Sequence, residues 1–141
     1  MESSFRILQL VRIAMLVSIV LYVIVGEVVA GKATGIREPN GGFYLALTLI
    51  AITVVGAVFA VRRALVLSRE EVLATRPDDP PTLARWRTGY IITYAMSEAV
   101  ALFGLVLRLL GSRLAQAAPF YVAGFALILF FSPRLPSSEI R

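Results

Sequence analysis

The sequence predicts an all-α integral membrane protein, a four-helix bundle in which successive spans are antiparallel. The chain has 141 residues, of which 58% are hydrophobic, and a mean hydropathy of +0.81. These values are higher than those of a typical soluble domain. The apolar residues gather in four long runs with arginines at their ends, as in membrane-spanning segments. A lone strand in lipid would leave its backbone groups unpaired, so each run is expected to be helical.

The predicted helices form one membrane domain covering residues 1–141, and they lie at about 5–30, 43–66, 88–110 and 117–131. The first run could instead be a secretory signal peptide, because Arg6 and Arg12 give it a basic start. Its length favours an uncleaved helix. Residues 68–87 are expected to form a polar loop, because the prolines there interrupt helices.

The distribution of basic residues predicts the orientation of the chain. Ten of the 14 basic residues lie near the N terminus, around the 68–87 loop or in the C-terminal tail. Because basic residues are enriched in cytoplasmic segments, both termini and this loop are predicted to be cytoplasmic in a bacterial inner membrane. Trp86, between Arg85 and Arg87, is expected to anchor the third helix at the membrane–water interface.

The composition excludes several classes of function. The chain has no cysteine and no histidine, which excludes disulfides, thiolate chemistry and histidine-ligated haem, and removes the usual zinc and iron–sulfur ligands. Few polar residues lie within the apolar runs, so we predict no enzyme active site, metal or cofactor. The net charge of +5 comes from arginines that flank helices, so it does not predict nucleic-acid binding. The expected partners are the lipid bilayer and either further copies of the chain or a larger membrane complex.

The third apolar run carries an acid near its middle, Glu98. A charge at the centre of a membrane helix disfavours insertion by about 2.5–3.5 kcal/mol on translocon scales. Such an acid is therefore expected to face other helices or a water-filled cavity. Tyr94 lies one helical turn before Glu98 on the same face, and Ser97 precedes it directly. These three residues are the candidate proton- or cation-binding site.

Small residues predict where the helices approach one another closely, because they let helix backbones come together in membranes. The candidate packing residues occur in the second, third and fourth helices. They are Gly56, Ala57, Ala60, Gly89, Thr93, Ala101 and Gly124.

Residues 84–107 resemble the ring-forming proteolipid (c) subunit of rotary ATP synthases. The resemblance rests on Arg87-Thr88 followed by Ala95-Met-Ser-Glu98-Ala-Val-Ala-Leu-Phe-Gly-Leu-Val. That family places its ion-carrying acid in an Ala-x-x-Glu-Ala context, on the helix that follows a cytoplasmic loop. The resemblance implies that Glu98 binds a proton or sodium ion, with Ser97 and Tyr94 as neighbours. The whole chain resembles a family of small bacterial four-helix membrane proteins, since the first and fourth helices have no counterpart in a two-helix proteolipid.

Three functions remain open from the sequence, and the least favoured is a membrane enzyme or small-molecule transporter, because the chain shows no internal repeat and no proline at the centre of a span. The favoured prediction is a non-enzymatic accessory or structural subunit of a membrane complex, in which Glu98 is buried between helices and forms a hydrogen bond across them. The alternative is proton or sodium binding and translocation by Glu98. A second acid or a cluster of carbonyl groups near Glu98 would favour the alternative, and the sequence shows neither.

Overall fold

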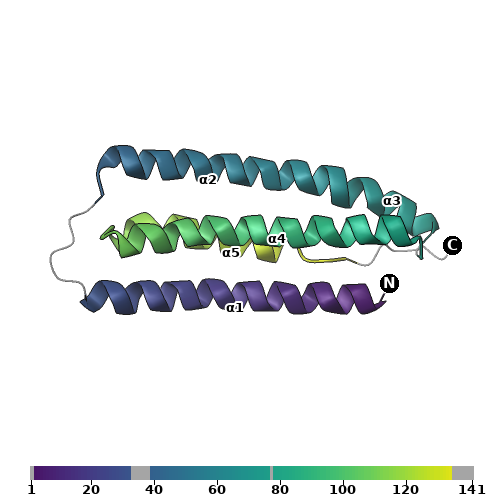
Figure 1. The fold of residues 1–141 in the computed structure, drawn as a ribbon, viewed down its shortest axis with the longest axis horizontal. Coiled ribbons are helices and arrows are strands. Elements are labelled where there is room, and N and C mark those ends of the chain that lie inside the picture. The colour runs from purple at the N-terminus through teal and green to yellow at the C-terminus, as the bar shows by residue number, and fades with distance from the viewer. Residues whose placement is uncertain (1, 33–38, 77, 135–141) are drawn as a thin grey trace.

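The computed structural model describes residues 2–32, 39–76 and 78–134, which form an all-α bundle without strands (Figure 1). Four rods make up this described part of the chain. They are α1 (Glu2–Lys32), a continuous rod of α2 (Gly41–Val61), η1 (Arg62–Leu67) and α3 (Ser68–Thr75), then α4 (Pro80–Leu109), and α5 (Leu114–Phe130). The predicted all-α bundle is therefore confirmed.

Helix α4 is the centre of the bundle. It packs against α1, α5 and all three segments of the second rod. Helices α1 and α2 lie on opposite sides of the α4–α5 pair, and successive rods run antiparallel (Figure 1). The N terminus and the α3–α4 turn lie at one end, which we call the terminal end. The α4–α5 turn lies at the other, the loop end (Figure 1).

Three of the rods are long and apolar enough to cross a membrane, namely α1, the rod Gly41–Thr75 and α4. Their surfaces carry many exposed large apolar side chains, such as Leu10, 67% exposed, and Ile52, 63% exposed. Helix α5 is apolar but has only 17 residues, a length of about 25 Å at 1.5 Å per residue. These features fit a protein whose outer surface faces lipid.

The predicted polar loop at residues 68–87 is wrong for most of its length. The second rod stays helical to Thr75, and α4 already begins at Pro80. Asp79 caps α4, because its carboxylate accepts hydrogen bonds from the backbone N–H (3.3 Å) and the hydroxyl of Thr82. Pro80 and Pro81 occupy the first helical positions, where a missing N–H costs nothing. Prolines interpreted as helix breakers therefore start a helix.

The second rod extends beyond the expected end of its helix at about residue 66. The chain passes through the π-helical segment η1 and continues as α3 to Thr75. Val58 and Val66 are fully buried and Leu73 is 1% exposed, so one inward-facing stripe runs along the whole rod. This stripe packs α3 onto α4, and the contact explains why α3 is helical although its sequence is polar.

Individual residues explain how the chain starts α2 and how it turns between α4 and α5 at the loop end. The side chain of Asn40 caps α2 by accepting a hydrogen bond from the backbone N–H of Phe43 at 2.8 Å. Gly111 has φ 94° in the α4–α5 turn, a conformation that glycine adopts without strain. Helix α5 begins at Leu114, so Pro119 lies inside the helix and not in its first turn.

Small residues bring α4 close to its neighbours. A Cβ atom added at Gly124 would lie 2.6 Å from the carbonyl oxygen of Ser97 and 2.9 Å from the Cβ of Ala101. A Cβ added at Gly89 would lie 2.8 Å from the Cβ of Leu65. Thr93, also on α4, is fully buried. The α4–α5 and α4–η1 contacts therefore need small residues at these positions.

The expected packing face of α2 is wrong for Gly56 and Ala60. Both residues are exposed, and a Cβ added at Gly56 would meet nothing within 4 Å among the described residues. Ala57 is half-buried. Helix α2 instead buries Ala51 and Val58 against the bundle. Because α2 is apolar on every side, its composition does not determine which face turns inward.

Candidate functional site

Glu98 lies where α4 meets α1. Its carboxyl oxygen Oε1 accepts a hydrogen bond from the hydroxyl group of Tyr22 at 2.5 Å. Both side chains are half-buried. The bond joins two helices that are far apart in sequence, and it gives a membrane-embedded carboxyl group the polar partner that lipid lacks. Tyr22 is thus the polar partner of Glu98, and sequence reasoning did not identify it.

The predicted neighbours Tyr94 and Ser97 do not hydrogen-bond to Glu98. The hydroxyl of Tyr94 donates to the carbonyl oxygen of Phe131 at 2.9 Å, and the hydroxyl of Ser97 donates to that of Thr93 at 2.7 Å. Both side chains are fully buried. Helical spacing correctly puts Tyr94 and Glu98 near one face, but the long tyrosine side chain reaches the end of α5 instead. The predicted three-residue ion site is therefore not assembled.

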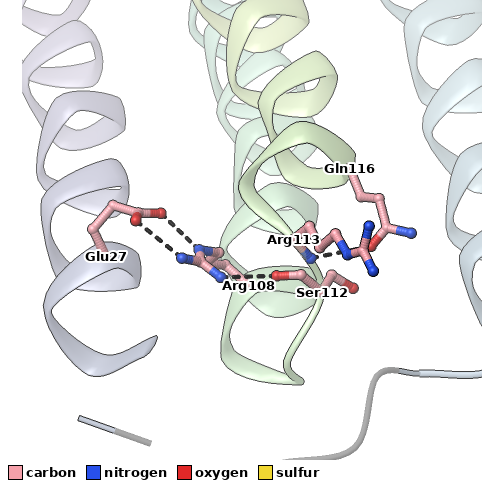
Figure 2. A network of polar contacts seen from close by, with 5 residues as sticks. All are labelled: Glu27, Arg108, Ser112, Arg113 and Gln116. Atoms are coloured by element: carbon pink, nitrogen blue, oxygen red, sulfur yellow. Dashed lines mark hydrogen bonds and ion pairs between the residues drawn. The ribbon is translucent and has the colours of Figure 1, made fainter. Parts of the chain in front are cut away.

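A second polar contact joins α1 to α4 nearer the loop end. Arg108 donates to both carboxylate oxygens of Glu27, with Nε–Oε1 at 2.6 Å and Nη2–Oε2 at 3.0 Å (Figure 2). Its Nη1 donates to the carbonyl oxygen of Ser112 at 2.9 Å. The side chains of Arg108 and Glu27 are 19% and 39% exposed. One guanidinium group therefore ties α1, α4 and the α4–α5 turn together, and bidentate geometry makes such pairs specific.

The C-terminal end of α5 is held by side chains of other helices. Arg12 of α1 donates through Nε to the carbonyl oxygen of Ile128 and through Nη2 to that of Leu129, both at 3.3 Å. Tyr94 supplies the donor for Phe131. The last carbonyls of a helix have no partner within it, and leaving them bare in an apolar setting is unfavourable. These donors therefore let a short helix end inside the bundle.

Trp86 is not an interface anchor in the fold. Its side chain is fully buried, and its ring packs edge-on against that of Tyr90 at 5.1 Å between centroids. The flanking Arg85 and Arg87 are exposed. The sequence context placed these three residues together at a membrane surface, but only the two arginines face outward.

The arrangement around Glu98 offers limited chemistry. It contains one carboxyl group and one phenol, which can exchange hydrogen bonds or hold a single proton. Within residues 2–32, 39–76 and 78–134, no group of three or more acidic side chains could hold a metal ion. The chain matches no protein-family model, no curated protein and no solved structure. The likeness to the rotary proteolipid thus depends on the short stretch of α4 alone.

Replacing Tyr22 by phenylalanine is expected to lower the free energy of unfolding by about 0.6–2 kcal/mol, the usual range for an interhelical hydrogen bond in a membrane. The change removes the donor to Glu98 and keeps the ring. Reversible unfolding in mixed micelles, followed by circular dichroism, measures the effect.

Tyr44→Phe is the matched control for this experiment. The Tyr44 ring packs against Phe120 at 6.2 Å, and its hydroxyl forms no hydrogen bond with any residue in the described part of the chain. This control is expected to leave stability unchanged within about 0.5 kcal/mol. Equal effects of Tyr22→Phe and Tyr44→Phe would contradict a helix-pairing hydrogen bond at Glu98.

Proposed function

We propose that this protein is a non-enzymatic accessory or structural subunit of a larger membrane complex, in which Glu98 pairs helices. One observation carries the proposal: the carboxyl group of Glu98 accepts the Tyr22 hydrogen bond between α1 and α4. The nearest candidate partners on its own helix, Tyr94 and Ser97, are engaged with backbone carbonyls. The polar side chains of α4 are thus used in holding the bundle together.

The outer surface of the bundle supports a role in a larger assembly. Helices α1 and α2 each contact the α4–α5 pair from one side only, so most of their surface stays uncovered. That surface is apolar, as lipid or the transmembrane helices of another subunit require. A subunit of this kind acts by occupying a position between other chains, and it needs no cofactor of its own.

We place the protein in a bacterial inner membrane, with the terminal end of the bundle in the cytoplasm. The N terminus and the α3–α4 turn lie at that end (Figure 1). Arg6, Arg69, Arg76 and Arg85 belong to the segments around it. An excess of arginine on one side is the main determinant of membrane orientation.

The second candidate function is proton or sodium binding by Glu98, as the proteolipid resemblance implies. It draws support from the partial exposure of Glu98, which leaves one side of the carboxyl group uncovered by this chain. In this case Tyr22, and not Tyr94 or Ser97, would be the neighbouring ligand. An intramembrane acid is a candidate ion site by default.

Glu98→Gln separates the two functions. Glutamine has nearly the same shape and still accepts the Tyr22 hydrogen bond, but it cannot ionise. If Glu98 is structural, Glu98→Gln is expected to leave the stability of the bundle unchanged. In its source membranes, the variant is also expected to migrate on a native gel with the same assembly as the wild type. Glu98→Leu, which removes the acceptor, is expected to destabilise the bundle by about 0.6–2 kcal/mol and to weaken that assembly.

Carbodiimide labelling tests the second function directly. Dicyclohexylcarbodiimide reacts with protonated carboxyl groups in apolar surroundings. Two results together would support ion binding and contradict the structural proposal. They are labelling of Glu98 that is suppressed by sodium or by high pH, and loss of stability or assembly in Glu98→Gln. No labelling, with Glu98→Gln fully tolerated, is the result expected for a helix-pairing residue.

A further inference from the structure

Three buried nitrogen atoms lack hydrogen-bond partners at the terminal end of the bundle. They are Nη1 of Arg62, Nε of Arg69 and the indole Nε1 of Trp86, and none has an acceptor among the described residues. Each of these groups can only donate a hydrogen bond. A buried donor without an acceptor is unfavourable, so this end of the bundle requires an acceptor, and the arginines require a negative charge.

The packing of η1 and α3 on α4 brings these groups to one region. Gly89 of α4 lies against Leu65 and Val66 of η1. Because the two rods are antiparallel, Arg69 and Trp86 both lie one turn from this contact, on the same side. Tyr90 continues the cluster, since its ring contacts that of Trp86.

Arg62 sits at the other side of the same contact. The carbon Cζ of its guanidinium group lies 4.5 Å from the ring centre of Phe131 and 5.7 Å from that of Tyr90. The side chain is half-buried, so part of it reaches the surface of the bundle. The two aromatic rings flank the guanidinium group, but its Nη1 atom has no acceptor among the described residues.

Three backbone carbonyls at the end of α5 already accept hydrogen bonds from other side chains. The carbonyl oxygens of Ile128 and Leu129 accept hydrogen bonds from Arg12, and Phe131 accepts one from Tyr94. Among the described residues, the acid that contacts this cluster is Glu70, whose Oε1 lies 3.4 Å from the hydroxyl of Tyr90. The charge of the region is therefore positive, with Arg12, Arg62 and Arg69 against Glu70.

An apolar groove between α2 and α5 leads to this region. It consists of two adjacent hollows with almost entirely apolar walls, and Val55 and Ala123 line both of them. Phe59 and Phe130 line the hollow nearer the terminal end. Phe59 packs on Phe131 at 5.3 Å between ring centroids, and Arg62 lies one turn further along the same rod. The groove and the guanidinium group thus form one continuous surface.

We propose that this surface binds an anionic phospholipid, with an acyl chain in the α2–α5 groove and the phosphate at Arg62, with Arg69 seven residues further along the same rod. The groove matches a hydrocarbon chain, and the cationic end matches a phosphate. Basic pockets beside membrane helices bind anionic headgroups in this way.

Native mass spectrometry of the protein in detergent tests the proposal. The probes are dioleoyl phosphatidylglycerol and dioleoyl phosphatidylcholine, which share acyl chains and differ in net charge. The wild type is expected to retain phosphatidylglycerol preferentially. Arg62→Gln is expected to weaken that binding about fivefold or more, the factor expected from one basic residue near a membrane surface.

The neighbouring arginine provides a matched control. Arg63 is exposed and carries the same charge, so Arg63→Gln is expected to keep the preference for phosphatidylglycerol. Val55→Phe fills the groove without changing any charge and is expected to weaken binding of both lipids. Circular dichroism verifies that each variant is folded.

Two results would overturn the proposal. Equal losses in Arg62→Gln and Arg63→Gln would indicate attraction to a diffuse basic surface and not to a site. Phosphatidylglycerol binding that appears only after removal of residues 135–141 would indicate that the tail, and not a lipid, supplies the acceptor.

Discussion

Gly124→Ala is expected to lower the free energy of unfolding by about 1–3 kcal/mol, the usual cost of overpacking a tight contact. The added Cβ would lie 2.6 Å from the carbonyl oxygen of Ser97 and 2.9 Å from the Cβ of Ala101. Neither neighbour can turn away, because one is backbone and the other is a short side chain on a buried helix. Helices α4 and α5 must therefore separate, which loosens the contact at the centre of the bundle.

Gly56→Ala is the matched control for this change. It adds the same methyl group to a helix, but the new Cβ meets nothing within 4 Å in the described residues. Alanine favours the helical backbone by up to about 1 kcal/mol over glycine, so the control is expected to hold or raise stability. Unfolding in mixed micelles compares the two. A Gly124→Ala protein as stable as Gly56→Ala would contradict the close α4–α5 contact.

Arg108→Gln is expected to lower the free energy of unfolding by about 2 kcal/mol, after allowing for solvent screening of its partly exposed contacts. The side chain donates to both oxygens of Glu27 and to the carbonyl oxygen of Ser112. Its loss therefore releases α1 and the α4–α5 turn together (Figure 2). Thermal unfolding in detergent, read by circular dichroism, measures the change.

Glu27→Gln is expected to have a smaller effect, below about 1 kcal/mol. Glu27 is 39% exposed against 19% for Arg108, so water can replace part of what it loses. Glutamine also still accepts one hydrogen bond from Arg108, and the bond from Arg108 to Ser112 remains. An effect of Glu27→Gln as large as that of Arg108→Gln would show that the ion pair alone, without the turn contact, determines stability here.

The sequence predicted the bundle because the hydrophobic runs alone require helices in lipid. It predicted the boundaries poorly where local chemistry is ambiguous. Pro80 and Pro81 are compatible with either a loop or the first helical turn, and only the cap from Asp79 decides between them. The inward face of α2 could not be predicted either, because apolar residues lie on every side of this helix.

The candidate site could be predicted only in part. An acid in an apolar run identified Glu98 as a special residue, but helical spacing compares residues on one helix and says nothing of the neighbouring one. Tyr22 was still visible as one of few hydroxyl groups in the first run. The pairing of Glu27 with Arg108 could have been anticipated from the topology, because both residues lie near the loop end of helices that run in the same direction.

The central position of α4 has a consequence for how the protein is made. The ribosome produces α1 and α2 before the helix on which both of them pack, so each must wait in the bilayer as an independent segment. Both α1 and α2 are more apolar than α4. A smaller share of their residues is buried inside the bundle than in α4. Helices α1 and α2 are thus suited to lie in lipid as single helices before α4 is made. Helix α4 is more polar, and it is inserted when α1 and α2 are already in the membrane and can pack against it.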